Sequence, residues 1–65
     1  MTSAPKVLVI DDEPQIHRFL TPALEAAGYA PLRALTGAEG LRLAATATPA
    51  LVLLDLGLPP VDAGL

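Results

Sequence analysis

Three aspartates are the residues of this sequence best suited to chemistry: the adjacent pair Asp11 and Asp12, and Asp55. The pair follows the apolar run 7–10, and Asp55 follows the apolar run 51–54. In an open parallel sheet, ligands bind beyond the carboxyl ends of the strands, where such residues would meet if the two strands are neighbours. Clustered carboxylates repel one another unless a cation binds, and oxygen ligands that keep some water suit Mg²⁺. The pattern therefore predicts a metal-assisted phosphoryl-transfer site.

The same aspartates also have a purely structural interpretation. Acidic residues ahead of a helix often serve as N-caps, and an aspartate after a strand is often a turn residue. On position alone, the two interpretations of Asp11 and Asp12 carry similar weight. Asp55 favours the chemical interpretation, because it ends four consecutive apolar residues and gives the acidic pair a partner.

Five elements are predicted to position these residues, beginning with a strand and a helix. The strand at about 6–10 lacks polar alternation, which is typical of a central parallel strand covered on both faces. Acidic residues followed by Pro14 indicate a helix at about 14–27, which Gly28 ends. Pro22 predicts a kink in this helix without a break. Its apolar face is expected to contain Ile16, Phe19, Leu20, Ala23, Leu24 and Ala27.

The remaining elements complete an alternating pattern. A strand at about 29–35 contains Pro31, which predicts an edge position because proline has no N–H for a second ladder. Thr36 and Glu39 fit a capping box, in which each side chain bonds the other residue's free backbone N–H, for a helix at about 37–46. An apolar strand at about 51–55 and a loop at 56–65 follow. Short links between alternating strands and helices require parallel pairing, so the predicted fold class is α/β with an open parallel sheet in a single domain, 1–65.

Composition excludes several classes of protein. The chain has 52% hydrophobic residues and no cysteine, so disulfides and thiolate metal sites are excluded. With a net charge of −3 and only four Lys and Arg residues, the chain lacks the basic surface that binds a nucleic-acid backbone. Neither apolar run approaches the length needed to cross a membrane, and we expect a cytoplasmic protein without membrane contact.

Two segments resemble the signature segments of the receiver domains of two-component response regulators, in wording and in separation. They are Val7-Leu-Val-Ile-Asp-Asp-Glu-Pro14 and Leu51-Val-Leu-Leu-Asp-Leu-Gly-Leu-Pro59. The stretch 55–59, together with Arg18-Phe19-Leu20, most resembles the OmpR-type branch that regulates Kdp potassium-transport operons. The resemblance covers nearly the whole chain and about the first half of a receiver domain. It implies a flavodoxin-like sheet truncated to strand-helix-strand-helix-strand.

The resemblance also implies roles for individual residues. Asp55 resembles the phospho-accepting nucleophile, Asp12 a direct Mg²⁺ ligand, Asp11 a ligand acting partly through water, Gly57 a ligand through its backbone carbonyl, and Pro59 the turn-forming proline after the phosphorylation site. The implied partner is a sensor histidine kinase that supplies the phosphoryl group. The implied output is transcription, controlled through a DNA-binding domain absent from this chain. Such a domain is not an enzyme for a separate substrate, although a complete one would catalyse its own phosphotransfer and dephosphorylation.

The sequence departs from the family pattern in two places. Ala63 stands between Asp62 and Gly64, where the family usually has Asp-Gly. The family's switch Ser or Thr and its Lys, from the fourth and fifth strands, have no counterpart before Leu65. We therefore expect the isolated chain to hold no stable phosphoryl group. We also expect it to self-associate through the strand at 51–54, whose unpaired edge lies beside four apolar side chains.

Two functions of other classes fit parts of the pattern. A haloacid-dehalogenase-type phosphohydrolase also places an Asp nucleophile after an apolar strand, but requires a second Asp two residues later, where this sequence has Gly57. The second alternative is a non-catalytic module that assembles with copies of itself. The size of the protein in solution distinguishes this module from a receiver that folds as a monomer.

The remaining polar residues need no functional role to explain them. His17 is predicted to be an exposed histidine of the first helix, because it has no partner histidine nearby. Arg33, Arg42 and Glu39 are predicted to be solvated surface residues. The glycines at 37 and 40 lack the spacing of a phosphate-binding loop.

Overall fold

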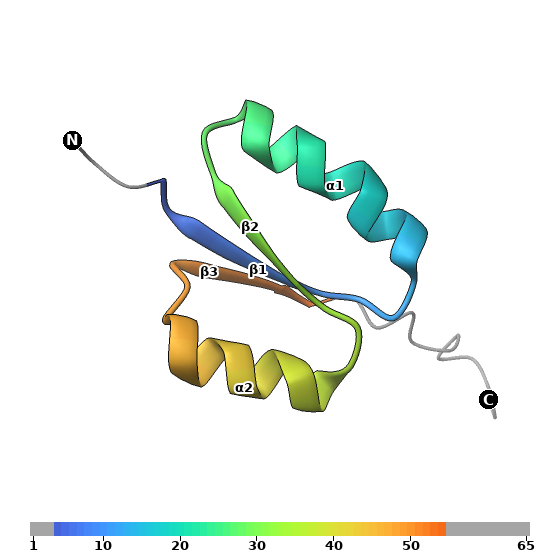
Figure 1. Cartoon of the computed structure of the whole chain (residues 1–65), viewed down its shortest axis with the longest axis vertical. Helices are drawn as coiled ribbons and strands as arrows, with labels where there is room; N and C mark the ends of the chain where they lie inside the picture. The colour runs from blue at the N-terminus through green and yellow to red at the C-terminus, as the bar shows by residue number, and fades with distance from the viewer. Residues whose placement is uncertain (1–3, 55–65) are drawn as a thin grey trace, which may run out of the picture.

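The computed structural model describes residues 4–54 of the 65-residue chain. The elements are β1 (Lys6–Ile10), α1 (Pro14–Ala26), β2 (Ala30–Ala34), α2 (Gly37–Ala47) and β3 (Leu51–Leu54). The strands form one parallel sheet in the order β2-β1-β3. The two helices lie on opposite faces of this sheet (Figure 1). The predicted class is confirmed: these are the elements and the strand order of a truncated flavodoxin-like α/β fold.

Strand β1 is the centre of the sheet and pairs with both neighbours. Val7 lies opposite Pro31 of β2 and Leu51 of β3, and Ile10 lies opposite Ala34 and Leu54. The apolar residues of β1 are buried, with none more than 7% exposed. The central position predicted from the lack of polar alternation is therefore confirmed. Strand β2 is an edge strand, so its proline interrupts no second ladder, as expected.

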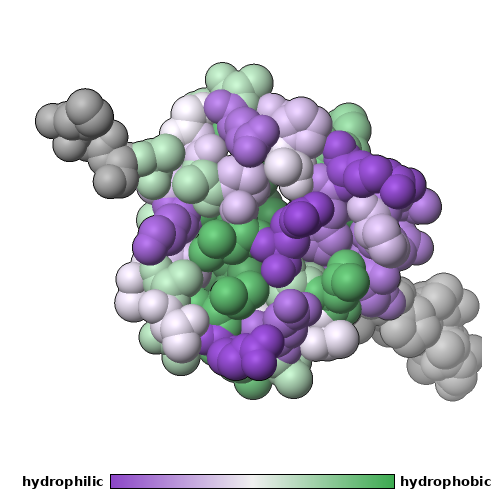
Figure 2. All heavy atoms as spheres, viewed as in Figure 1, coloured by the Kyte–Doolittle hydropathy of each residue, from purple (hydrophilic) through white to green (hydrophobic). Residues whose placement is uncertain are grey.

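The core lies between the sheet and α2. Leu8, Ile10 and Ala34 are its buried members, and Leu32, Leu43 and Ala44 pack against them. Figure 2 shows apolar side chains between the two helices, bordered by strongly hydrophilic ones. Gly40 permits the close approach of α2, because a Cβ atom at this position would lie 2.7 Å from Cγ1 of Ile10.

We expect Gly40→Ala to lower the free energy of unfolding by about 1–3 kcal/mol, the usual cost of forcing an extra methyl group into a packed core. This loss outweighs the gain of about 1 kcal/mol that alanine brings to a helix. Gly37→Ala is the matched control, because its Cβ would meet no atom within 4 Å. Urea unfolding of both variants checks this, and a Gly40→Ala midpoint equal to or above that of Gly37→Ala would contradict the packing described.

The inner face of α1 differs from the sequence prediction. His17, expected on the surface, is only 2% exposed, whereas Phe19 is 71% exposed. Ala23 and Ala27 are also exposed, whereas Ile16, Leu20 and Leu24 are half-buried, in agreement with the predicted apolar face. The buried stripe therefore follows positions 17, 20 and 24, a helical spacing that the polarity of histidine concealed.

The ends of α1 agree with the sequence. The helix continues through Pro22 to Ala26, while the kink stays a prediction. Gly28 follows with a φ of 94°, in the left-handed region that favours glycine, and ends the helix as expected.

No helix within residues 4–54 is long and apolar enough to cross a membrane.

The start of α2 matches the capping box in one of its two bonds. The Thr36 hydroxyl accepts a bond from the Glu39 N–H at 3.1 Å. The Glu39 carboxylate, however, accepts from the N–H of Leu35 at 3.0 Å and not from that of Thr36. Glu39 is half-buried, and its bond to Leu35 lies at the surface. Arg33 and Arg42 are exposed as expected.

Candidate functional site at the carboxyl end of the sheet

Asp11 continues directly from β1 and is held in place by the backbone around it. Its N–H donates to the Ala34 carbonyl at 3.0 Å, which extends the pairing with β2 by one residue. Its side chain is 2% exposed, and Oδ1 accepts a bond from the Glu13 N–H at 2.8 Å. The carboxylate is therefore fixed at the end of the central strand, and the backbone bond orients it.

Asp12 is exposed beside it, at the carboxyl end of the sheet. Neither aspartate is the N-cap of α1, because that position belongs to Glu13, whose side chain makes no capping bond. Of the structural roles expected for the two aspartates, only a turn bond is present, in which the Asp11 carboxylate accepts from the Glu13 N–H. This leaves the Asp12 carboxylate, within the described part of the chain, without a hydrogen bond.

The ends of β1 and β3 lie side by side. Ile10, which precedes the acidic pair, is the register partner of Leu54, which precedes Asp55. Asp55, Gly57 and Pro59 lie outside the described residues, as does the predicted loop at 56–65. The predicted adjacency of the two strands is therefore confirmed, while the metal ligands and the phosphorylation site stay predictions.

The donor set suits a hard divalent cation. Within residues 4–54, no group of three His, Cys, Asp or Glu residues could hold a metal ion. The chain supplies carboxylate oxygens there from Asp11 and Asp12, and such oxygens are the ligands that Mg²⁺ takes from proteins. A complete set requires further oxygens, which the sequence offers in Asp55 and Gly57.

His17 is a residue of this region that the sequence interpretation missed. Its Nε2 lies 2.8 Å from the backbone carbonyl oxygen of Asp11, and a carbonyl only accepts, so Nε2 carries the proton. The bond ties α1 to the end of β1 and fixes the backbone that carries Asp11. The spacing of His17 from Leu20 and Leu24 was the signal that could have placed it on the buried face.

We expect His17→Leu to destabilise the protein by about 1–3 kcal/mol, because it leaves the buried Asp11 carbonyl without its donor. His17→Gln should cost less, since the glutamine amide can donate to the same oxygen. Thermal unfolding of the two variants measures the difference. Equal stability of the leucine and glutamine variants would show that the bond contributes nothing.

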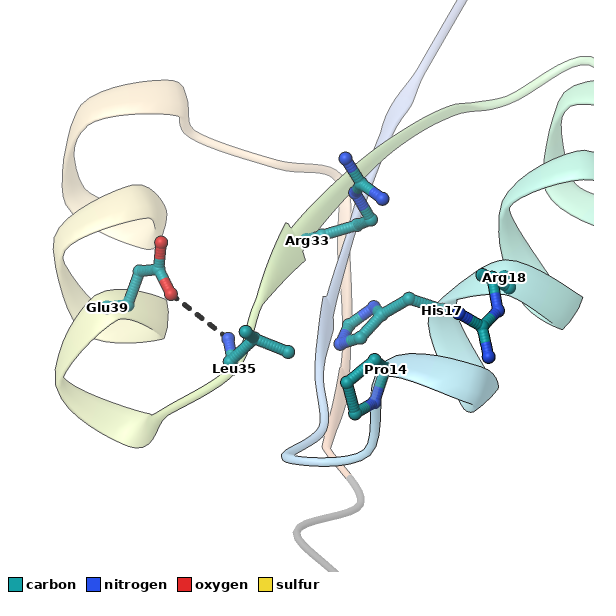
Figure 3. Close-up of a pocket in the computed structure, with 6 residues that line it drawn as sticks. All are labelled: Pro14, His17, Arg18, Arg33, Leu35 and Glu39. Atoms are coloured by element: carbon teal, nitrogen blue, oxygen red, sulfur yellow. Dashed lines mark hydrogen bonds between the residues drawn. The ribbon is translucent and has the colours of Figure 1, made fainter.

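A cavity of about 460 Å³ opens next to this histidine, at the β2 edge of the sheet. It is lined by Pro14, His17, Arg18, Arg33, Leu35 and Glu39 (Figure 3). These residues come from α1, β2, the link after β2 and α2, and none comes from β3. Within the described residues, the cavity therefore adjoins the end of β1 through His17, which bonds the Asp11 carbonyl, and receives no residue from β3.

The fold and the strand-end residues together define a class of protein. A parallel sheet in the order β2-β1-β3, flanked by one helix on each face and carrying an acidic pair at the end of β1, is the arrangement expected for the start of a receiver domain.

Comparison with known proteins identifies the family. The chain is 58% identical over 56 residues to the transcriptional regulatory protein KdpE of Mycobacterium tuberculosis. The aligned residues make up 86% of this chain and 25% of that protein. The chain is 50% identical over 56 residues to KdpE of Escherichia coli, with shares of 86% and 25%. It is 45% identical over 58 residues to the DNA-binding regulator RpaA of Synechocystis, with shares of 89% and 24%. No protein-family model matches the chain.

The chain belongs to the OmpR-type response regulators, as a segment of their receiver domain. It spans about a quarter of the length of the curated relatives it matches. The resemblance seen in the two signature segments is thus confirmed, including the likeness to the Kdp branch.

Proposed function

We propose that this chain is the phospho-accepting part of a two-component receiver, with Asp55 as the acceptor and Mg²⁺ as the cofactor. The observation that carries the proposal is the register of β1 with β3, in which Ile10 pairs with Leu54. Residues that directly follow paired positions of parallel strands emerge at the same edge of the sheet. Asp11, Asp12 and Asp55 follow those positions in the sequence.

The reaction is the transfer of a phosphoryl group from a phosphohistidine of a sensor kinase. A carboxylate oxygen of Asp55 attacks phosphorus, the O–P bond forms, the N–P bond breaks, and the histidine nitrogen leaves with the electron pair. Asp12, Asp11 and the Gly57 carbonyl would hold Mg²⁺, which neutralises charge on the phosphoryl oxygens when bound. Asp11 is suited to this because its carboxylate is already fixed by Glu13 and its backbone by His17.

The output would be control of transcription. Relatives of this chain are named transcriptional regulators, and one is named as DNA-binding. We propose that the phosphorylated receiver acts through a DNA-binding domain in another part of such a protein. A phosphohydrolase of the haloacid-dehalogenase type has no support among the relatives compared, all of which are named as regulators.

A hybrid regulator tests the metal requirement of this proposal. In it, the chain replaces the matching segment of the Mycobacterium tuberculosis KdpE, to which it is 58% identical over 56 residues. Incubated with acetyl phosphate, the hybrid should gain one phosphoryl group by intact mass when Mg²⁺ is present and none when the metal is chelated. Asp12→Asn should slow the gain about 10-fold or more, because the site loses a charged ligand oxygen. An unchanged rate in chelator, or in Asp12→Asn, would refute the assigned metal role.

A further inference from the structure

The cavity at the β2 edge has the chemistry of a site for a small oxyanion. Arg18 and Arg33 line it from α1 and β2, and within residues 4–54 neither makes an ion pair. Glu39 is the acidic residue of the lining, and its Oε1 already accepts a bond from the Leu35 N–H. Two arginines therefore line the cavity, against one carboxylate that is occupied by the backbone.

The placement of Arg33 follows from the fold. Its strand neighbours Leu32 and Ala34 belong to the core beneath α2, and side chains alternate along a strand, so Arg33 points to the opposite face, toward α1. Arg18 follows His17 in α1, and Figure 3 draws both arginines among the residues that line the cavity. Guanidinium groups are planar forks of donors that match carboxylate and phosphate groups.

His17 contributes a buried ring to the lining of the cavity. His17 is 2% exposed, its Nε2–H is used by the Asp11 carbonyl, and its Nδ1 is buried with no hydrogen-bond partner within residues 4–54. Buried polar atoms without a partner are rare in folded proteins. With the proton on Nε2, the neutral ring presents Nδ1 as an acceptor. Because Nδ1 has no exposed surface, a ligand in the cavity would be held by the arginines and not by this nitrogen.

We propose that this cavity binds a small organic molecule carrying a phosphate or carboxylate group, held by Arg18 and Arg33. The volume of about 460 Å³ exceeds what an inorganic oxyanion needs and falls in the range of ligand sites, roughly 300–1,000 Å³. Pro14 and Leu35 supply the apolar part of the lining for the body of the ligand. Arg18 and Arg33 have no part in the proposed phosphorylation site, so variants of these two arginines test the cavity separately from phosphorylation of Asp55.

NMR titrations of the hybrid regulator at constant ionic strength test the site, with inorganic phosphate, AMP and adenosine as probes. We expect saturable shifts of the Arg33 backbone amide and of the His17 ring nitrogens with AMP, and no such shifts with adenosine, which lacks the oxyanion. Saturation by inorganic phosphate as well as AMP would place the recognition in the oxyanion itself. Tighter binding of AMP would assign the remaining affinity to the organic body.

Matched arginine variants make the test specific. Arg18→Gln and Arg33→Gln should each weaken AMP binding about 10-fold or more, since each removes a charge-assisted bond. Arg42→Gln is the control, because Arg42 is an exposed arginine of α2 that does not line the cavity. The proposal is overturned if AMP causes no saturable shift, if adenosine binds equally, or if Arg42→Gln weakens binding as much as the other two. Amide spectra of the unliganded variants separate loss of binding from loss of folding.

Discussion

Asp55→Asn is expected to abolish phosphoryl transfer to the hybrid regulator while leaving its folding unchanged. Asparagine keeps the volume of the side chain but lacks the carboxylate oxygen that attacks phosphorus, so no acyl phosphate can form. The effect should be complete, because the nucleophile itself is removed. Intact mass after incubation with acetyl phosphate or with a phosphorylated histidine kinase gives the readout.

The matched control for this change is Glu25→Gln. Glu25 is an exposed acidic residue of α1, and its conversion removes one charge and one carboxylate without touching the strand ends. The control should be phosphorylated like the unmodified hybrid, and circular dichroism should give the same helix content for both variants. Undiminished phosphorylation of Asp55→Asn would show that another residue is the acceptor.

The second large effect concerns the 65-residue protein itself, which we expect to self-associate through β3. This strand lies at the edge of the sheet in the described residues, and its four side chains are 36–65% exposed. An apolar strand with an unpaired edge is a template for pairing with another chain. We therefore expect sheet extension or exchange of this segment between identical chains, seen as dimers or larger species in sedimentation velocity runs.

Charge on the edge should suppress this association. Leu51→Lys or Leu54→Lys should shift the protein toward the monomer, because a lysine on an edge strand disfavours pairing. Leu41→Lys is the control, since Leu41 is 75% exposed on α2 and lies away from the edge. A compact, cooperatively folding monomer at all concentrations would refute the proposed association, and an equal effect of all three lysines would show that β3 is not the interface.

The sequence was most informative where one local rule decided the outcome. The lack of polar alternation in 6–10 predicted a strand buried on both faces, and a proline in 29–35 predicted an edge strand. Gly28 and the Thr36 hydroxyl predicted the end of one helix and the start of the other. The two helix ends depend on backbone geometry within a few residues, which residue type largely determines. The positions of the two strands were predictable because residue type limits which strands can be central and which can only lie at an edge.

The sequence was misleading where tertiary contacts overruled polarity. Histidine is commonly exposed, but His17 finds an acceptor in the Asp11 carbonyl and takes a buried position, which turns Phe19 outward. Glu39 bonds Leu35 in place of the residue that the capping box specifies. The cavity at the β2 edge is assembled from α1, β2 and α2, so no contiguous stretch of sequence announces it. The candidate phosphorylation site was predicted from two local motifs, and the register of β1 with β3 is the contact that links them.

The most direct test of the account locates the phosphoryl group on the chain. The hybrid regulator is phosphorylated in Mg²⁺, reduced with borohydride, which converts an aspartyl phosphate to homoserine, and mapped by peptide mass spectrometry. We predict homoserine at position 55 alone, in the peptide that contains Gly57 and Pro59. Homoserine at Asp11, Asp12 or Asp62, or phosphoryl incorporation without any reduced aspartate in this chain, would contradict the assignment of Asp55 as the acceptor.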